Sequence, residues 1–302
     1  MLPKEGKILS WEVKFFGFTL VELLVVIAIV GFLSTIVLAV TSGVSEQGRI
    51  AKGLQFGKHL ENSLGAYLVG RWSFDEGVGS LAKDTSGWDN SGTLINSPTW
   101  RCVATDSSYT PSGNGCSLEF NGSNGYVDFG NDGSLQTFNS ITLEAWVYPK
   151  SFTAYTVILG KDTPYYYGIK SPGNVLYLRH DNLGGGWTNV NLSTAIAINK
   201  WYHIVATWDG STVRIYLNGE YKGGQGGLTG TISSTESSLA VGSYHGVTAA
   251  DHMFPGLIDE VRIYSTALTA SQIQSQYYAG LNRLLAKKII DEQEYQARVI
   301  LK

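Results

Sequence analysis

The sequence contains few charged residues and few cysteines, and each shortage excludes a class of protein. Charged residues make up only 16% of it, below the roughly 25% of typical soluble domains. The net charge of −3 and the scattered Lys and Arg residues argue against attraction to nucleic acid, so we expect no nucleic-acid partner. Two cysteines exclude a dense disulfide scaffold, and the sequence contains no His–Cys cluster, phosphate loop or nucleophile elbow.

Glycine and aromatic residues are abundant instead, with 36 Gly and 17 Tyr, which favours a turn-rich β-structure. The runs Trp201–Trp208 and Val213–Leu217 are separated by Asp209-Gly210 and followed by Asn218-Gly219. Asp-Gly and Asn-Gly supply the positive φ of type I′ turns, so these residues predict a three-strand meander. Further strand-like runs follow without helices between them, which predicts a mostly β fold, an antiparallel sandwich. These runs are 117–120, 126–129, 141–148, 156–159, 175–179 and 239–242.

One long apolar run, from Phe18 to Val40, contains a single formal charge, Glu22. The run is long enough to cross a membrane, which takes about 20 residues. An acidic residue inside such a span costs about 2.5–3.5 kcal/mol on insertion scales and is by default functional. A secretory signal peptide, with an apolar core of about 7–15 residues, and a plain membrane anchor are the alternatives. The run is longer than a signal-peptide core, and a plain anchor gives no reason for Glu22. Lysines before the run predict that the C-terminal bulk lies across the membrane from the cytoplasm.

The segment Gly17-Phe18-Thr19-Leu20-Val21-Glu22 resembles the N-terminus of type IV prepilins and secretion pseudopilins. The resemblance implies cleavage by prepilin peptidase between Gly17 and Phe18, followed by methylation of the new amine. It implies that Glu22 neutralises a neighbouring subunit's amine during filament assembly. The partners it implies are other pilin subunits, through the N-terminal helix, and the peptidase. The location it implies is the inner membrane before assembly, and afterwards an extracellular filament or the cell surface.

The domain layout follows from these patterns. We expect a leader at 1–17, a pilin-type helix at 18–64 with its transmembrane part at 18–40, a β-sandwich at 65–268 and a helical tail at 269–302. The apolar face of the helix beyond the membrane could pack on the sandwich or on neighbouring subunits. Thr269 and Gln272 form a capping box that begins the tail. The tail packs on the sandwich or on a partner subunit, or is loosely ordered.

A second resemblance covers roughly residues 68 to 275. Trp72-Ser73-Phe74-Asp75-Glu76-Gly77, then 117–122, 141–147 and 201–206, and finally 256–264 resemble a bacterial laminin G-like domain of the concanavalin A-like class. The resemblance implies two stacked antiparallel sheets in a jelly roll. It also implies an extracellular binding domain for glycan or protein, and hence adhesion. A filament subunit without a ligand and a filament-associated glycosidase are the alternatives.

The two cysteines, Cys102 and Cys116, lie close together in a Ser- and Gly-rich stretch. In an extracellular protein such a pair predicts a disulfide. Closing a loop of about 15 residues would stabilise the fold by about 3 kcal/mol in the chain-entropy model. Two free thiols are the alternative.

A calcium ion is the cofactor that the laminin G-like resemblance suggests. Asp84 is the first candidate ligand, because Asp84, Asn90 and their neighbours supply closely spaced oxygen atoms. Asp259 on the closing strand is a further candidate. Alternatively, Asp84 and Asn90 make Asx-turns in a Gly- and Ser-rich loop.

Aromatic residues near loops are candidates for stacking on sugars. They are Trp187, which follows three glycines that predict a loop, Tyr166 and Tyr244. Alternatively, these side chains fill the core.

We do not expect an enzyme. A glycosidase needs two carboxylates about 5–5.5 or about 6.5–9.5 Å apart. The acidic pairs Asp75-Glu76 and Asp259-Glu260 are adjacent, so in an extended strand their side chains point to opposite faces.

Overall fold

The computed structural model describes the C-terminal four-fifths of the chain almost continuously, together with isolated residues before it. The chain divides into two compact units, Met1–Arg49 and Ile50–Lys302, and the fold below is that of the second. Gly17, Phe18, Glu22 and nearly all of the predicted span lie outside the described residues. Among the described residues, no helix is long and apolar enough to cross a membrane. The described residues are 24, 48, 51–53, 55, 57–59, 61–103, 106, 109–111, 115–136, 138–161, 165–180, 186–232, 236–244, 251–288 and 290–300.

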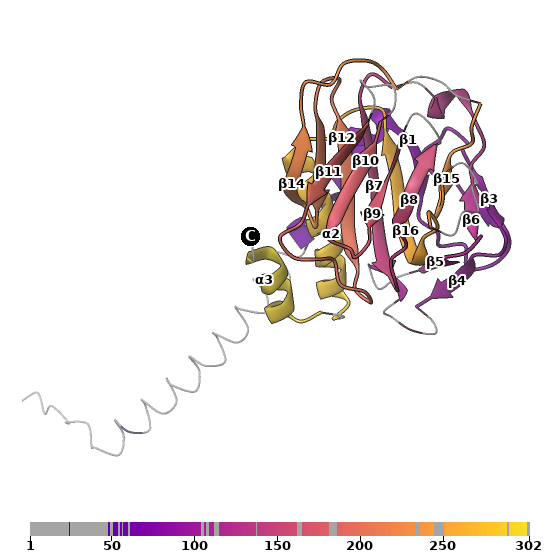
Figure 1. The fold of residues 1–302 in the computed structure, drawn as a ribbon. Helices are drawn as coiled ribbons and strands as arrows, with labels where there is room; N and C mark the ends of the chain where they lie inside the picture. The colour runs from indigo at the N-terminus through magenta and orange to yellow at the C-terminus, as the bar shows by residue number, and fades with distance from the viewer. Residues whose placement is uncertain are drawn as a thin grey trace, which may run out of the picture. The chain divides into compact units, whose positions relative to one another are not determined.

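The described residues of the second unit form two stacked antiparallel sheets, which confirms the predicted sandwich (Figure 1). The first sheet has the order β14 (Glu220–Gln225), β13 (Val213–Leu217), β12 (Tyr202–Trp208), β7 (Ile141–Pro149), β16 (Pro255–Tyr264), β5 (Cys116–Asn121), β4 (Thr99–Cys102), with β1 (Leu68–Trp72) also paired to β16. The second sheet has the order β11 (Trp187–Asn191), β10 (Val175–Arg179), β9 (Tyr165–Lys170), β8 (Tyr155–Lys161), β15 (Ala240–Val241), β6 (Tyr126–Asp128), β3 (Gly92–Ile95), β2 (Leu81–Ala82). Among the described residues, a short 3-10 helix at Gly65–Tyr67 precedes β1, and another at Gly133–Leu135 lies between β6 and β7.

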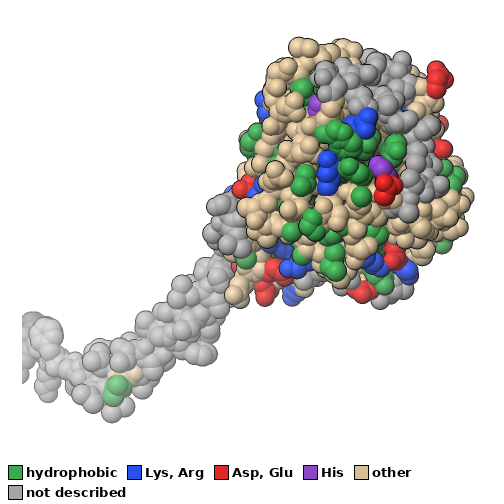
Figure 2. All heavy atoms as spheres, in the orientation of Figure 1, with side chains coloured by type: hydrophobic (Ala, Val, Ile, Leu, Met, Phe, Trp, Pro, Cys, Tyr) green, Lys and Arg blue, Asp and Glu red, His purple; other side chains and the backbone are tan. Residues whose placement is uncertain are grey.

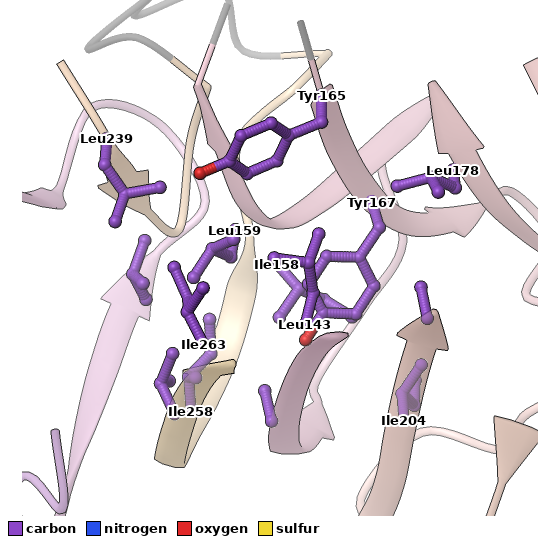
Figure 3. Packing of buried hydrophobic residues seen from close by; sticks show 14 of the residues in the cluster. Leu143, Ile158, Leu159, Tyr165, Tyr167, Leu178, Ile204, Leu239, Ile258 and Ile263 are labelled. Atoms are coloured by element: carbon purple, nitrogen blue, oxygen red, sulfur yellow. The ribbon is translucent and has the colours of Figure 1, made fainter. Parts of the chain in front are cut away.

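The core lies between the sheets, where alternate residues of each strand meet. Tyr165 and Tyr167 of β9 reach into this space from the second sheet, and both are 1% exposed (Figure 3). Leu143, Ile258 and Ile263 come from the first sheet, as part of the same buried cluster. A period-2 pattern therefore determines which residues of each strand are left for the outer surfaces.

The predicted meander of β12, β13 and β14 is confirmed, but only one of its turns has the predicted type. Asn218 and Gly219 link β13 to β14 as a two-residue turn, with φ of 52° and 77°. The loop after Asp209 is longer, because Trp208 pairs with Val213. The Oδ1 atom of Asp209 accepts hydrogen bonds from the backbone nitrogens of Ser211 and Thr212. The connection is therefore an Asx-type loop instead of a type I′ turn.

The helical tail packs on the outer face of the first sheet. Helix α2 (Ala270–Ala286) begins with the predicted capping box of Thr269 and Gln272. Tyr277 of α2 stacks on Trp146 of β7 with ring centroids 5.7 Å apart. Helix α3 (Glu292–Ile300) follows, and its Tyr295 belongs to the same buried cluster. Figure 1 shows both helices in yellow at the side of the sandwich. The tail is therefore packed on its own domain.

The described residues between 51 and 64 are helical and pack against α2. A Cβ atom added to Gly57 would lie 2.8 Å from the Cβ of Ala279, so the two helices approach closely there. Leu64 is buried with Tyr264 of β16. This segment therefore contacts the sandwich domain, which was one of its two predicted partners.

The predicted disulfide joins Cys102 of β4 to Cys116 of β5, which lie opposite each other in register. The Cα atoms are 3.9 Å apart. The bond links the edge strand of the first sheet to its neighbour.

Candidate functional site

The outer surface of the second sheet carries a cluster of aromatic side chains. It arises from strand alternation, because Tyr166 on β9, Tyr177 on β10 and Trp187 on β11 all point away from the core. We call the cluster the aromatic face. Its members are Tyr155, Tyr166, Tyr177, Trp187, Tyr244 and His252. Figure 2 shows this side of the molecule, with hydrophobic side chains gathered over β8–β11 and basic side chains among them.

Trp187 is at the centre of the aromatic face. Its ring centroid lies 5.5 Å from that of Tyr155, 5.5 Å from that of Tyr166 and 5.3 Å from that of Tyr177. Tyr244 stacks on Tyr166 at 4.8 Å, and His252 stacks on Tyr155 at 5.0 Å. Edge-on and offset contacts of this kind stabilise each pair by about 0.5–1.5 kcal/mol. The rings therefore hold one another in place.

Two glycines make room for the buried part of this face. A Cβ atom at Gly168 would lie 3.0 Å from the hydroxyl of Tyr177 and 2.1 Å from the carbonyl oxygen of Thr156. At Gly160 it would lie 2.2 Å from the Cβ of Tyr166. Glycine at both positions lets the tyrosines lie close to the sheet.

Two cations lie over the rings. The Nζ atom of Lys170 is 4.4 Å from the Trp187 ring and 5.3 Å from the Tyr155 ring. The guanidinium of Arg179 is 5.0 Å from the Trp187 ring. Lys170 also donates a hydrogen bond of 2.8 Å to Oδ1 of Asn189, and partial burial lowers the pKa of its ammonium group. Cations over aromatic rings are attracted by about 0.5–2 kcal/mol each.

A family model described as the concanavalin A-like lectin/glucanases superfamily matches residues 121–274, half of the chain. The chain belongs to this superfamily. The matched range contains every member of the aromatic face, so the face is part of the concanavalin A-like domain.

A second family model, the prokaryotic N-terminal methylation motif, matches residues 14–38. The predicted cleavage and assembly residues, Gly17, Phe18 and Glu22, lie within the match. The chain therefore joins a prepilin-type methylation motif to a laminin G-like, concanavalin A-like domain, as predicted.

Solved structures share the fold of the concanavalin A-like domain. Domain 4 of AbnA, a GH43 extracellular arabinanase from Geobacillus stearothermophilus solved in complex with arabinotriose, has a TM-score of 0.54 and 23% identity, over 70% of this chain and 98% of that one. The binding domain of Paraclostridial Mosquitocidal Protein 1 has a TM-score of 0.56 and 16% identity, over 72% of this chain and 53% of that one. The Danio rerio adhesion G-protein coupled receptor V1 is 28% identical over 148 residues, which are 46% of this chain and 2% of the receptor.

The structure brings the three predicted ligand residues, Trp187, Tyr166 and Tyr244, into one cluster. Trp187 is the first residue of β11, so it stands on the sheet and not in a loop. Tyr166 is only 3% exposed and supports its neighbours, whereas Trp187 and Tyr244 are partly exposed. Sequence reasoning missed Tyr155 and Lys170, whose outward positions follow from alternation along β8 and β9.

The predicted metal ligand Asp84 holds its own loop together. Its Oδ1 atom accepts hydrogen bonds from the backbone nitrogens of Arg71 and Ser86, at 2.9 and 2.8 Å. Its Oδ2 atom accepts from the Ser86 hydroxyl at 2.7 Å and the Asn90 nitrogen at 2.9 Å. The Asn90 amide donates to the carbonyl oxygen of Val69 at 2.7 Å. Asp84 thus makes the Asx-type turn that was the alternative to calcium, whereas the Asn90 side chain bonds to Val69 and Ser134, which are distant in sequence.

Asp259, the third predicted ligand, is 2% exposed at an irregularity in the pairing of β16 with β7. Burial raises the pKa of its carboxyl well above the ordinary value, and the charges of Glu260 and Asp75 raise it further. Among the described residues, no group of three or more His, Cys, Asp and Glu side chains has the arrangement of a metal site. Calcium binding stays a prediction.

The adjacent acidic pairs serve the fold. Asp75 accepts a hydrogen bond of 2.9 Å from the backbone nitrogen of Cys116, and Glu76 accepts one of 2.8 Å from that of Lys83. Glu260 pairs with Arg262 at 2.6 Å.

Proposed function

We propose that this chain is a prepilin-type filament subunit whose concanavalin A-like domain binds a saccharide through the aromatic face, and that this binding serves adhesion. In this proposal prepilin peptidase processes the leader, and the N-terminal helix anchors the chain in the inner membrane and then in the filament. The observation that carries the binding part is the position of the aromatic face. Trp187, Tyr155 and Tyr244 are partly exposed on the second sheet, whereas α2 packs on the outer side of the first.

The chemistry of the face suits a sugar. A sugar ring presents C–H groups on its faces and hydroxyl groups at its edges. The exposed parts of Trp187 and Tyr155 offer apolar surface to the C–H groups. The amide of Asn189, which is exposed beside Trp187 on β11, offers hydrogen bonds to the hydroxyl groups. The rings are already packed on one another, so little side-chain freedom would be lost on binding.

The fold is compatible with this proposal, because the related domain of the arabinanase was solved with arabinotriose. We propose binding without turnover, since the acidic pairs named above make structural contacts. A subunit that only builds the filament is the outcome that the following experiment would favour if no ligand is found.

The test is a glycan array probed with the full chain in detergent, first with calcium and then with a chelator. Saturable binding in both conditions would support a saccharide site that needs no metal. Binding that is lost on chelation, and lost equally in Asp84→Ala with calcium present, would support the calcium prediction as well. Silence in both conditions would contradict saccharide binding and favour a structural subunit.

A further inference from the structure

Lys170 is the feature of the aromatic face that neutral sugars do not require. Many described Lys and Arg side chains elsewhere in the domain pair with carboxylates. Examples are Arg101 and Lys150 with Glu119, Arg214 with Asp209, Lys222 with Glu220, and Arg262 with Glu144. Among the described residues, no carboxylate pairs with Lys170, whose Nζ atom lies over Trp187, Tyr155 and Tyr177.

The geometry points to an anionic saccharide as the ligand: a sugar bearing a carboxylate or sulfate group that Lys170 binds while the ring packs on Trp187. This inference rests on the proposed function and narrows its ligand class. The ammonium group has three donors, and Asn189 accepts from one of them at 2.8 Å. The remaining donors are available for an anion, and charge-assisted hydrogen bonds are roughly twice as strong as neutral ones.

Arg179 is a second basic residue over the indole, 5.0 Å from the ring. It is opposite Trp187 in the pairing of β10 with β11 and opposite Tyr166 in the pairing with β9. Its guanidinium donates a hydrogen bond of 3.4 Å to the Tyr166 hydroxyl, so it contacts a second member of the face. Two basic side chains of the described residues therefore lie within 5.0 Å of the Trp187 ring.

Asp251, one acidic residue at the margin of the face, has a partner of its own. Asp251 is exposed and lies 2.8 Å from Nδ1 of His252, which lowers the pKa of Asp251. His252 separates this carboxylate from the rings, because it stacks on Tyr155. Asp251 is therefore paired with His252 and not with Lys170.

The test compares saccharides that differ only in charge, using the full chain in detergent and titration calorimetry. Oligogalacturonate is paired with its methyl ester, and a sulfated oligosaccharide with its desulfated form. We expect the charged member of at least one pair to bind about tenfold more tightly, and that preference to decrease with added salt. A preference in the oligogalacturonate pair indicates a carboxylate ligand, and a preference in the sulfated pair indicates a sulfate ligand.

Three variants locate the effect. Lys170→Met should abolish the preference for charge, whereas Lys170→Arg should keep it. Lys83→Met removes the same charge next to β2, at the opposite end of the second sheet, and should change nothing. Equal loss in Lys83→Met and Lys170→Met would overturn the assignment to Lys170.

The possible failures differ from one another. Equal, salt-insensitive binding of charged and neutral forms would overturn this inference and leave the proposed function standing. Binding of neither form, with the array silent too, would contradict the proposed function itself.

Discussion

Replacement of Arg262 by Met should destabilise the domain more than removal of an exposed arginine does. Arg262 is 5% exposed on β16 and donates a hydrogen bond of 2.7 Å to Oε1 of the fully buried Glu144. The same guanidinium binds Glu260 at 2.6 Å and lies 3.9 Å from Glu61 in the segment that packs on α2. Removal of one partner from a buried ion pair costs about 3–5 kcal/mol, because the other charge stays buried without compensation.

The assay is thermal unfolding of the full chain, followed by near-UV circular dichroism. For a domain of roughly this size, each kcal/mol shifts Tm by about 2–4 °C, so Arg262→Met should lower it by about 6–20 °C. Arg214→Met removes an arginine whose ion pair with Asp209 is partly exposed, and it should cost less than about 1 kcal/mol. Equal losses in the two variants would refute the reasoning.

The pH dependence gives this prediction a second check. Burial raises the pKa of Glu144, but Arg262 and His203 together outweigh it and hold that pKa below its ordinary value. A lowered pKa contributes stability at neutral pH that is lost as the pH falls through the folded-state value. Without Arg262 this contribution shrinks, so the deficit of Arg262→Met should be largest near neutral pH and decrease toward about pH 4. A deficit that is constant with pH would contradict the assignment to Glu144.

Three further predictions concern other parts of the chain. Asp259→Asn should raise Tm at pH 7, because burial raises the pKa of Asp259 and its charged form therefore destabilises the fold; the gain should vanish below about pH 4. Gly57→Val should loosen the segment at 51–64 and cost about 1–3 kcal/mol, since a Cβ atom there meets Ala279 at 2.8 Å. Hydrogen exchange would detect it. Glu22→Ala should leave cleavage after Gly17 intact, by N-terminal sequencing, yet keep the chain out of filaments, by immunogold microscopy.

Each of these has its own control. A Tm of the Asp259→Asn variant that falls at pH 7 only when calcium is present would instead support Asp259 as a calcium ligand. Gly48→Val introduces the same side chain at a helical glycine with no atom within 4 Å of the added Cβ, and should leave exchange at 51–64 unchanged. Normal incorporation of Glu22→Ala into filaments would contradict its assembly role.

Local patterns in the sequence were sufficient for the parts of the fold that depend on neighbouring residues. The Asn218-Gly219 turn and the capping box of Thr269 each involve residues at most three apart, so their chemistry could be predicted directly. The prediction of a type I′ turn at Asp209 was wrong, because the Asp209 side chain accepts backbone hydrogen bonds that compete with a two-residue hairpin.

The aromatic face was harder to predict because it depends on which strands pair. Trp187, Tyr166 and Tyr244 could be named as candidates from the sequence, but their proximity results from the order β11-β10-β9-β8-β15. The tyrosines at 165–167 alternate, so Tyr165 and Tyr167 fill the core while Tyr166 belongs to the aromatic face. The role of Tyr166 in ligand binding stays a prediction. Lys170 could not be singled out without its distance to Trp187.

The central claim is that the aromatic face is the saccharide site, and a pair of tryptophan variants tests it most directly. With a ligand taken from the array, Trp187→Ala should weaken binding by about 2 kcal/mol or more, roughly thirtyfold in Kd, as for a central aromatic contact. Trp88 is 55% exposed on the loop after β2, and Trp88→Ala should bind as the unmodified chain does. Unchanged binding by a folded Trp187→Ala chain, or loss of binding in Trp88→Ala alone, would contradict the claim.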